Sequence, residues 1–129
     1  MLDYGCGKGV LAEILSWVKI QNYDPAVPEW AREPAPADLV VCTDVLEHVE
    51  PDCLDAVLDH LQRLTLKALF VEIGLVPAFK HLDDGRNAHL IVQPVEWWLP
   101  RLWQRFSLHS VEMNYANHGM IAVLEKLKG

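Results

Sequence analysis

Three glycines at alternating positions follow an acidic residue near the start of the chain, in the stretch LDYGCGKG (residues 2–9). Glycine is the residue of sharp turns and of places where a ligand approaches the main chain closely. The spacing differs from the dinucleotide-binding pattern G-x-G-x-x-G, and a P-loop would need Ser or Thr after Lys8. The stretch therefore predicts a strand-to-helix turn that either holds a ligand without a phosphate or binds nothing.

Length and composition narrow the class of protein. A chain of 129 residues with 51% hydrophobic and 22% charged residues predicts one globular domain over residues 1–129. The net charge of −7 argues against binding along a nucleic acid, although a short contact with one nucleic-acid end stays open. Cys6, Cys42 and Cys53 form no C-x-x-C pair, which favours free thiols and a cytoplasmic location. No apolar run has the length of a membrane span.

Hydrophobic periodicity predicts helices that alternate with strands. Helices are expected over residues 8–17, from Pro51 to about residue 66, and from Val95 through Phe106 with a bend at Pro100. Strands are expected over residues 18–24, 38–44, 67–73, 107–115 and 119–127, with 38–44 buried on both faces. Residues 24–38 are expected to be irregular, and residues 74–93 to be a long loop with functional residues. This order predicts a doubly wound α/β fold, with a mostly parallel sheet and a C-terminal antiparallel hairpin.

Polar residues follow several of the predicted strands. The glycine turn, Asp24, Asp44 and the loop after Ile73 each come directly after a strand. In open α/β sheets, ligands bind beyond the carboxyl ends of the strands. Asp24 lies some 20 residues beyond the first glycine, where a carboxylate can bind ribose hydroxyls. These features predict one ligand site at that edge of the sheet.

Three segments together resemble the class I S-adenosylmethionine-dependent methyltransferases. LDYGCGKG is similar to the first motif of that family, YDP (residues 23–25) to its ribose-binding strand end, and DLVVCTDVLEHV (residues 38–49) to the segment after its fourth strand. DGRNAHLI (residues 84–91) is similar to a compact subgroup from phage and bacterial genomes. The resemblance implies a Rossmann-like fold that lacks the third strand. It also implies a member trimmed at the N-terminus, because only Met1 and Leu2 precede Asp3.

The resemblance implies S-adenosylmethionine as the cofactor and methyl transfer to O or N of a small polar acceptor. Asp24 would bind the ribose hydroxyls, Pro25 would lie against the adenine, and the first motif would hold the methionine part. The cofactor-binding residues implied in this way are Asp3, Tyr4, Gly5, Cys6, Gly7, Asp24, Pro25, Thr43, Asp44 and Val45. Two alternatives stay open: a cofactor-binding module or partner subunit without catalysis, and a metal-dependent RNA-end 2′-O-methyltransferase.

Asp44, Glu47 and His48 form the pattern D-x-x-E-H. It is similar to E-x-x-E-H runs that bind a divalent metal in ubiquinone-type O-methyltransferases and in enzymes that methylate small-RNA ends. His89, in NAHL, would join them as the further histidine of the latter group. The resemblance thus implies His89, His48 and Asp44 as catalytic residues, and Asp44, Glu47, His48 and His89 as ligands of Mg²⁺ or Mn²⁺. The alternatives are His89 as a base without metal, and purely structural roles.

The remaining candidates depend on position in the predicted elements. Trp98 fits the apolar stripe of its helix, whereas Trp97, Arg86 and Asn87 are candidates for contacts with the acceptor. His60, His81, His109 and His118 are expected at the surface without a site role. The expected partner is a small-molecule acceptor, with no nucleic acid and no membrane, and a homodimer is an open alternative.

Overall fold

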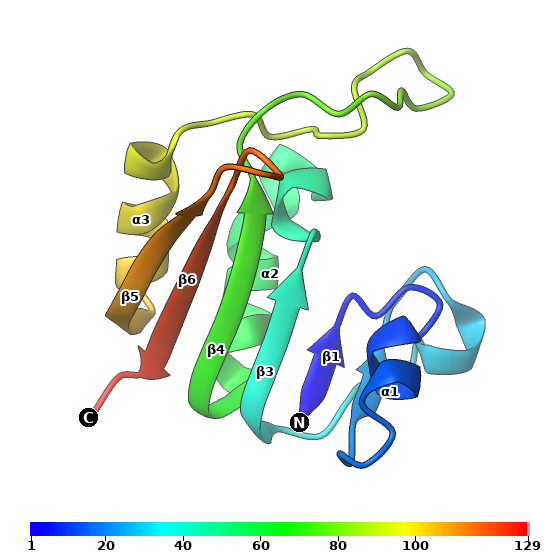
Figure 1. Cartoon of the computed structure of the whole chain (residues 1–129), viewed down its shortest axis with the longest axis vertical. Helices are drawn as coiled ribbons and strands as arrows, with labels where there is room; N and C mark the ends of the chain where they lie inside the picture. Colours follow the sequence, from blue (N-terminus) through cyan, green and yellow to red (C-terminus); the bar gives the residue numbers. More distant parts are fainter. Residues whose placement is uncertain (129) are drawn as a thin grey trace.

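A six-stranded mixed sheet forms the centre of the computed structural model, which describes residues 1–128. The strand order is β2-β1-β3-β4-β6-β5 (Figure 1). The strands are β1 Leu2–Tyr4, β2 Gln21–Tyr23, β3 Ala37–Thr43, β4 Thr65–Gly74, β5 Phe106–Asn114 and β6 Gly119–Lys126. Strands β1 to β4 are parallel, whereas β6 is antiparallel to both β4 and β5. This confirms the predicted α/β fold with a C-terminal antiparallel hairpin.

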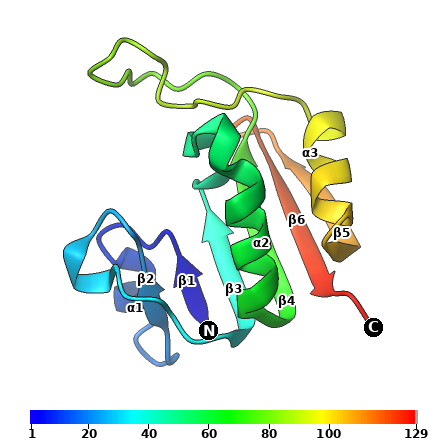
Figure 2. The same ribbon diagram turned by 180° about the vertical axis from the view of Figure 1, so that it is seen from behind.

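Helices lie on both faces of the sheet. They are α1 Val10–Ile14, α2 Leu54–Leu64 and α3 Val95–Trp103. Figures 1 and 2 show α2 and α3 on one face, and α1 on the opposite face beside β1 and β2. Within residues 1–128, no helix covers the part of that second face formed by β3, β4 and β6. We call this part the open face.

Helix α2 packs on the sheet through a single apolar stripe. Its buried residues are Leu54, Leu58, Leu61 and Leu64, spaced three or four apart as one helix face requires. The 3-10 turn η3 Pro51–Cys53 precedes the helix. At the other end, the hydroxyl of Thr65 donates to the carbonyl of Leu61 at 2.7 Å, satisfying one of the last helical carbonyls. The predicted helix is therefore found, but it begins at Leu54 after the 3-10 turn and ends at Leu64, because Thr65 and Leu66 belong to β4.

The expectation that residues 38–44 are buried on both faces is wrong. Val40 and Cys42 of β3 are fully buried on the side of α2, whereas Leu39 is 37% exposed on the other side. In β4 the same alternation buries Leu69 and Val71 and leaves Phe70 half-buried. The cause is the open face, where no helix of the described residues covers these strands.

The helix expected over residues 8–17 is also shorter and less buried than predicted. Helix α1 spans only Val10–Ile14, and its apolar residues Val10 and Ile14 are 52% and 64% exposed. It lies beside β1 and β2, which have three residues each. An edge this small cannot cover the apolar stripe of a longer helix, so the periodicity alone overestimates both length and burial.

The connections place the residues of interest at one end of the sheet. Residues 24–36 contain only the 3-10 turn η1 Pro28–Trp30 between β2 and β3, which confirms the predicted lack of a third strand. Residues 75–94 cross over the carboxyl ends of the strands, as expected for the long loop (Figure 1). Trp98 and Leu102 bury α3 against the sheet, but Phe106, expected on this helix, begins β5. None of the helices within residues 1–128 combines the length and apolarity needed to cross a bilayer.

Candidate functional site

The glycine turn follows β1 and is held by backbone hydrogen bonds. The N–H groups of Gly5 and Cys6 donate to the carbonyl of Tyr23, at 2.8 and 3.0 Å. Gly5 has φ +80°, and a Cβ placed there would lie 2.3 Å from Cγ2 of Val45. Gly7 has φ +55°, but a Cβ placed there would have no atom within 4 Å. The turn is therefore closely packed at Gly5 and open at Gly7.

Asp24 connects the end of β2 to the glycine turn. Its carboxylate accepts the N–H of Gly7 and the N–H of Ala26, each at 2.9 Å and each on a different oxygen. Because a carboxylate oxygen has two lone pairs, each oxygen can still accept one more hydrogen bond. Asp3 lies buried behind the turn, and burial, together with the charge of Asp24, raises the pKa of its carboxyl.

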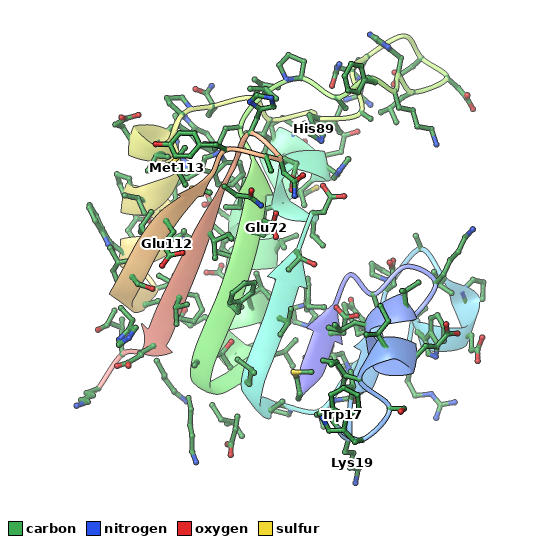
Figure 3. All side chains as sticks on the ribbon, viewed as in Figure 1. Trp17, Lys19, Glu72, His89, Glu112 and Met113 are labelled. Carbon is green, nitrogen blue, oxygen red and sulfur yellow. The ribbon has the colours of Figure 1, made fainter. Side chains whose placement is uncertain are left out.

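Two pockets adjoin each other at Asp44. The first, which we call the turn pocket, is lined by Tyr4, Gly5, Asp24, Pro25, Asp44 and Val45, with His48 at its side. The second, which we call the sheet-edge pocket, is lined by Thr43, Asp44, Glu47, Glu72, His89 and Asn117. Figure 3 shows His89 in the loop above the end of β4, on which Glu72 lies.

The predicted site residues divide between these pockets. Six of the ten expected around a cofactor line the turn pocket, whereas Thr43 lines the sheet-edge pocket. Asp3, Cys6 and Gly7 line neither pocket, and the hydroxyl of Tyr4 is bonded to His60. Asp44 has φ +59°, an uncommon conformation for a residue other than glycine, directly after β3. Its N–H donates to the carbonyl of Glu72 at 3.0 Å, which holds it between the pockets.

His48 and His89 are both oriented by backbone carbonyls. Nδ1 of His48 bonds the carbonyl of Ala88 at 2.9 Å, and Nδ1 of His89 bonds the carbonyl of Val76 at 2.6 Å. A carbonyl oxygen only accepts, so the hydrogen of each neutral ring lies on Nδ1 and the lone pair lies on Nε2. The ring centroids are 4.7 Å apart. Nε2 of His48 lies 3.4 Å from Oδ1 of Asp44, whereas Nε2 of His89 has no hydrogen-bond partner among the described residues.

Glu47 is the buried acid of the cluster. Its side chain comes from the 3-10 turn η2 Leu46–His48, and the residue is only 1% exposed. Oε2 accepts the N–H of Gly74, whereas Oε1 is buried without a hydrogen-bond partner. Burial raises the pKa of this carboxyl above its usual range. The structure brings Asp44, Glu47, His48 and His89 together as predicted, with one donor atom of each within 4.8 Å of the others.

Several predicted contacts with an acceptor are not found in either pocket. Trp97 stacks under the guanidinium of Arg101, at 3.5 Å from the ring centroid, in the groove between α2 and α3. Arg86 is paired with Glu50 and Asp84, outside the sheet-edge pocket. These side chains are engaged within the chain and do not line the pocket of His89.

Asn87 is also engaged within the loop. Its Oδ1 accepts the N–H groups of Ala78 and His89, each at 2.9 Å, and its Nδ2 donates to the carbonyl of Ala78 at 2.8 Å. It therefore orients His89 and does not line the pocket. Trp98, by contrast, is fully buried as predicted.

His60 was expected at the surface, and that expectation is wrong. Its Nδ1 bonds the hydroxyl of Tyr4 at 2.8 Å, and its Nε2 bonds the carboxylate of Glu33. Only 13% of its side chain is exposed. His81, His109 and His118 are exposed, as expected. The three cysteines are free.

Glu72 and Asn117 are site residues that the sequence analysis missed. Glu72 accepts hydrogen bonds from Asn114 and Asn117, at 3.1 and 3.5 Å. An acid inside the apolar run KALFVEI was a detectable signal for Glu72. Asn117 gave no such signal, because only the antiparallel pairing of β4 with β6 brings the turn before Gly119 to this edge.

Comparison with known proteins gives a consistent result. A family model described as a methyltransferase domain matches residues 1–114. TnmH has a similar structure, with a TM-score of 0.70 at 17% identity, covering 98% of this chain and 49% of TnmH. This chain therefore spans about half the length of TnmH. No curated protein matches its sequence.

Two further structures resemble this chain over more of their own length. Magnesium protoporphyrin IX methyltransferase ChlM from Synechocystis PCC 6803, solved with bound SAH, has a TM-score of 0.65 at 20% identity, covering 99% of this chain and 73% of ChlM. The N-methyltransferase NodS from Bradyrhizobium japonicum WM9, in complex with SAH, has a TM-score of 0.68 at 14% identity, covering 98% of this chain and 77% of NodS. At these identities the likeness concerns the fold.

Proposed function

We propose that this chain, which belongs to the methyltransferase domain family, binds S-adenosylmethionine in the turn pocket and methylates O or N of a small polar acceptor. The acceptor would occupy the sheet-edge pocket. One observation carries the proposal: the two pockets meet at Asp44, with Asp24 on one side and His89 on the other. Methyl transfer depends on alignment of donor and acceptor, and two adjoining pockets supply it.

Residues in the turn pocket and beside it fit the proposed cofactor. The open space at Gly7 and the free lone pairs of Asp24 suit a ribose that lies beside the glycine turn. Asp3, buried near the turn, would place a carboxyl group beside the cationic methionine part. When bound, S-adenosylmethionine supplies an electrophilic methyl group. The resemblance of the structure to the SAH complexes of ChlM and NodS supports this assignment.

The sheet-edge pocket would handle the acceptor. Glu72, which accepts a hydrogen bond from Asn117, forms a polar wall that can orient hydroxyl or amino groups. The Nε2 lone pairs of His48 and His89 can either take the proton of the acceptor or bind a cation. The net charge of −7 favours a small molecule over a nucleic acid.

Calorimetry with S-adenosylmethionine and S-adenosylhomocysteine tests the cofactor site. Asp24→Ala should weaken binding by about 1–3 kcal/mol, the scale of charge-assisted hydrogen bonds to ribose hydroxyls. Asp38→Ala is the matched control, since Asp38 is an exposed acid at the start of β3, away from the carboxyl ends of the strands. Equal affinity of the parent and Asp24→Ala would contradict the placement of the cofactor.

Transfer of a labelled methyl group to a panel of phenols, alcohols, amines and short RNA ends tests the reaction. Turnover on a small hydroxyl or amine is the expected result. Cofactor binding with no transfer to any member would instead support a non-catalytic binding module. Transfer to RNA alone would support the RNA-end alternative.

A further inference from the structure

The sheet-edge pocket is rich in acids and lacks strongly basic side chains. Three of its lining residues are Asp44, Glu47 and Glu72. No Lys or Arg among residues 1–128 lines this pocket or the turn pocket, and Arg86 of the loop above is engaged in ion pairs elsewhere. The volume of about 370 Å³ is that of a pocket for a small ligand, about 300–1,000 Å³. A ligand here therefore meets carboxylates and no ammonium or guanidinium group of the described chain.

Glu72 has one carboxylate oxygen engaged and one free. Its Oε1 accepts the amide hydrogens of Asn114 and Asn117, at 3.1 and 3.5 Å. Its Oε2 has no hydrogen-bond partner among the described residues. Glu72 follows Phe70 by two positions in β4, so its side chain lies on the open face, near the end of the strand (Figure 3). The two asparagines thus orient the carboxylate and leave one oxygen for a ligand.

Glu47 provides an independent indication of a ligand. The residue is only 1% exposed, and its Oε1 has neither a hydrogen-bond partner nor access to solvent. Its Oε2 accepts the N–H of Gly74, which also lines the pocket. A buried carboxylate oxygen without a partner is costly, and such groups are normally hydrogen-bonded or paired with a cation. An N–H donor bound in the pocket would supply the bond that this oxygen lacks.

We propose that the methyl acceptor is a small amine, which enters the sheet-edge pocket as an ammonium ion. This inference rests on the proposed function and narrows its acceptor from O or N to N. An ammonium group has only donors, and its charge is opposite to that of the free oxygens of Glu47 and Glu72. A hydroxyl compound brings no such charge. A carboxylate or phosphate would meet like charges, which disfavour binding.

His89 is positioned to take a proton from the ammonium group. Its Nδ1 donates to the carbonyl of Val76, which leaves the lone pair on Nε2 of a ring that lines the pocket. An ammonium nitrogen has no lone pair, so one proton first passes to Nε2 of His89. The amine nitrogen then bonds the methyl carbon while the bond from that carbon to sulfur breaks, and the electron pair stays on sulfur. The products are the N-methylammonium ion, S-adenosylhomocysteine and one proton, which His89 releases to water.

Binding of a simple amine without cofactor is the decisive test. Benzylammonium, benzyl alcohol and benzoate have similar shapes but are positive, neutral and negative. Each is titrated into the full chain by calorimetry, in phosphate buffer because Tris is itself an amine, with EDTA to remove metal ions. We expect one benzylammonium per chain, bound about 10-fold or more tightly than benzyl alcohol, because its hydrogen bonds are charge-assisted. Benzoate should not bind.

Glu72→Gln tests the free carboxylate oxygen. Gln keeps an oxygen for Asn114 and Asn117 but replaces the free oxygen with an NH₂ group. Affinity for benzylammonium should fall by about 10-fold or more, with little change for benzyl alcohol. Glu125→Gln is the matched control, since Glu125 is an exposed acid that pairs with Ala68 near the opposite end of β4. It removes the same charge and should bind benzylammonium like the parent.

Two results would overturn the amine: no preference for benzylammonium over benzyl alcohol, or equal losses in Glu72→Gln and Glu125→Gln. Transfer of a labelled methyl group to amines and to hydroxyl compounds separates this inference from the proposed function. Transfer to hydroxyl compounds but not to amines would leave the methyltransferase and exclude the amine. Failure to bind S-adenosylmethionine, with benzylammonium still bound, would reject the proposed function and with it the role of the amine as acceptor.

Discussion

At the scale of single residues, the buried surroundings of the Asp3 carboxyl affect the stability of the fold. Asp3 is buried beside the glycine turn, and burial raises the pKa of its carboxyl. The folded state therefore holds the Asp3 proton more tightly than the unfolded state does. The stability that this proton contributes is present below the unfolded pKa of 3.8 and is lost as the pH rises through the raised folded pKa. Above the raised folded pKa, the buried charge of Asp3 lowers the stability of the fold.

Asp3→Asn should accordingly stabilise the protein at neutral pH and weaken cofactor binding. The gain in free energy of unfolding should shrink as the pH falls from about 7 to about 4, because parent Asp3 becomes protonated there. Urea unfolding at both pH values measures the first effect, and calorimetry with S-adenosylmethionine measures the second. A gain that is independent of pH would mean that Asp3 is not desolvated in the folded state.

Gly5 and Gly7 of the glycine turn differ in the space around them. Gly5→Ala and Gly7→Ala both carry the cost of positive φ, about 1–2 kcal/mol. Gly5→Ala should nevertheless lower the free energy of unfolding more than Gly7→Ala. The reason is that only a Cβ at position 5 would collide with a neighbour, at 2.3 Å from Cγ2 of Val45. Gly7→Ala should chiefly weaken cofactor binding. Equal loss of stability in the two variants, by thermal unfolding, would show that Val45 moves aside at little cost.

The residue types of the site were readable from the sequence, but their orientation was not. The spacing D-x-x-E-H, to which the family resemblance added His89, predicted the cluster that the structure brings together. The carbonyls that hold the rings belong to Ala88 and Val76, and no sequence pattern marks a carbonyl. Glu72 and Asn117 come together only through strand pairing.

At the scale of elements, the loop of residues 75–94 positions His89 through its own hydrogen bonds. The amide of Asn87 makes three bonds, to both main-chain groups of Ala78 and to the N–H of His89. The N–H of Ile91 donates to the carbonyl of Glu47 at 3.1 Å, which attaches the loop to η2. Its length and irregularity were predictable, whereas these contacts depend on the end of the sheet below it.

Asn87→Ala should lower the methyl-transfer rate by about 10- to 100-fold, the scale of a small displacement of a catalytic group. Affinity for S-adenosylmethionine should stay within a few-fold, because Asn87 does not line the turn pocket. Arg86→Ala is the control in the same loop, since exposed ion pairs contribute little. Similar rates for both variants would mean that the loop holds His89 without Asn87.

Hydrophobic periodicity predicts the presence of a helix better than it predicts how deeply the helix is buried. The apolar stripe of α2 is buried as expected, whereas the similar stripe after the glycine turn forms a helix of five residues with Val10 and Ile14 exposed. The difference lies in what faces each stripe. Helix α2 packs on long central strands, and α1 lies beside two strands of three residues each.

At the scale of the whole molecule, the two faces of the sheet differ in how well they are covered. Val71 of β4 is fully buried toward α2, whereas Val123 of β6 lies half-buried on the open face. The two are close neighbours, because Val71 pairs with Ala122 and Val123 pairs with Phe70. The same substitution at these positions therefore compares the two faces directly.

Val71→Ala should lower the free energy of unfolding by about 2–3 kcal/mol, since it removes two buried methyl groups and leaves a cavity. Val123→Ala should cost less than about 1 kcal/mol, because its side chain already contacts water in the folded chain. Urea unfolding of both variants at low protein concentration gives the comparison. Should the two losses be equal, Val123 would be covered in solution, and a second copy of this chain on the open face would be the first candidate. Sedimentation of the parent over a range of concentrations would then distinguish a homodimer from a monomer.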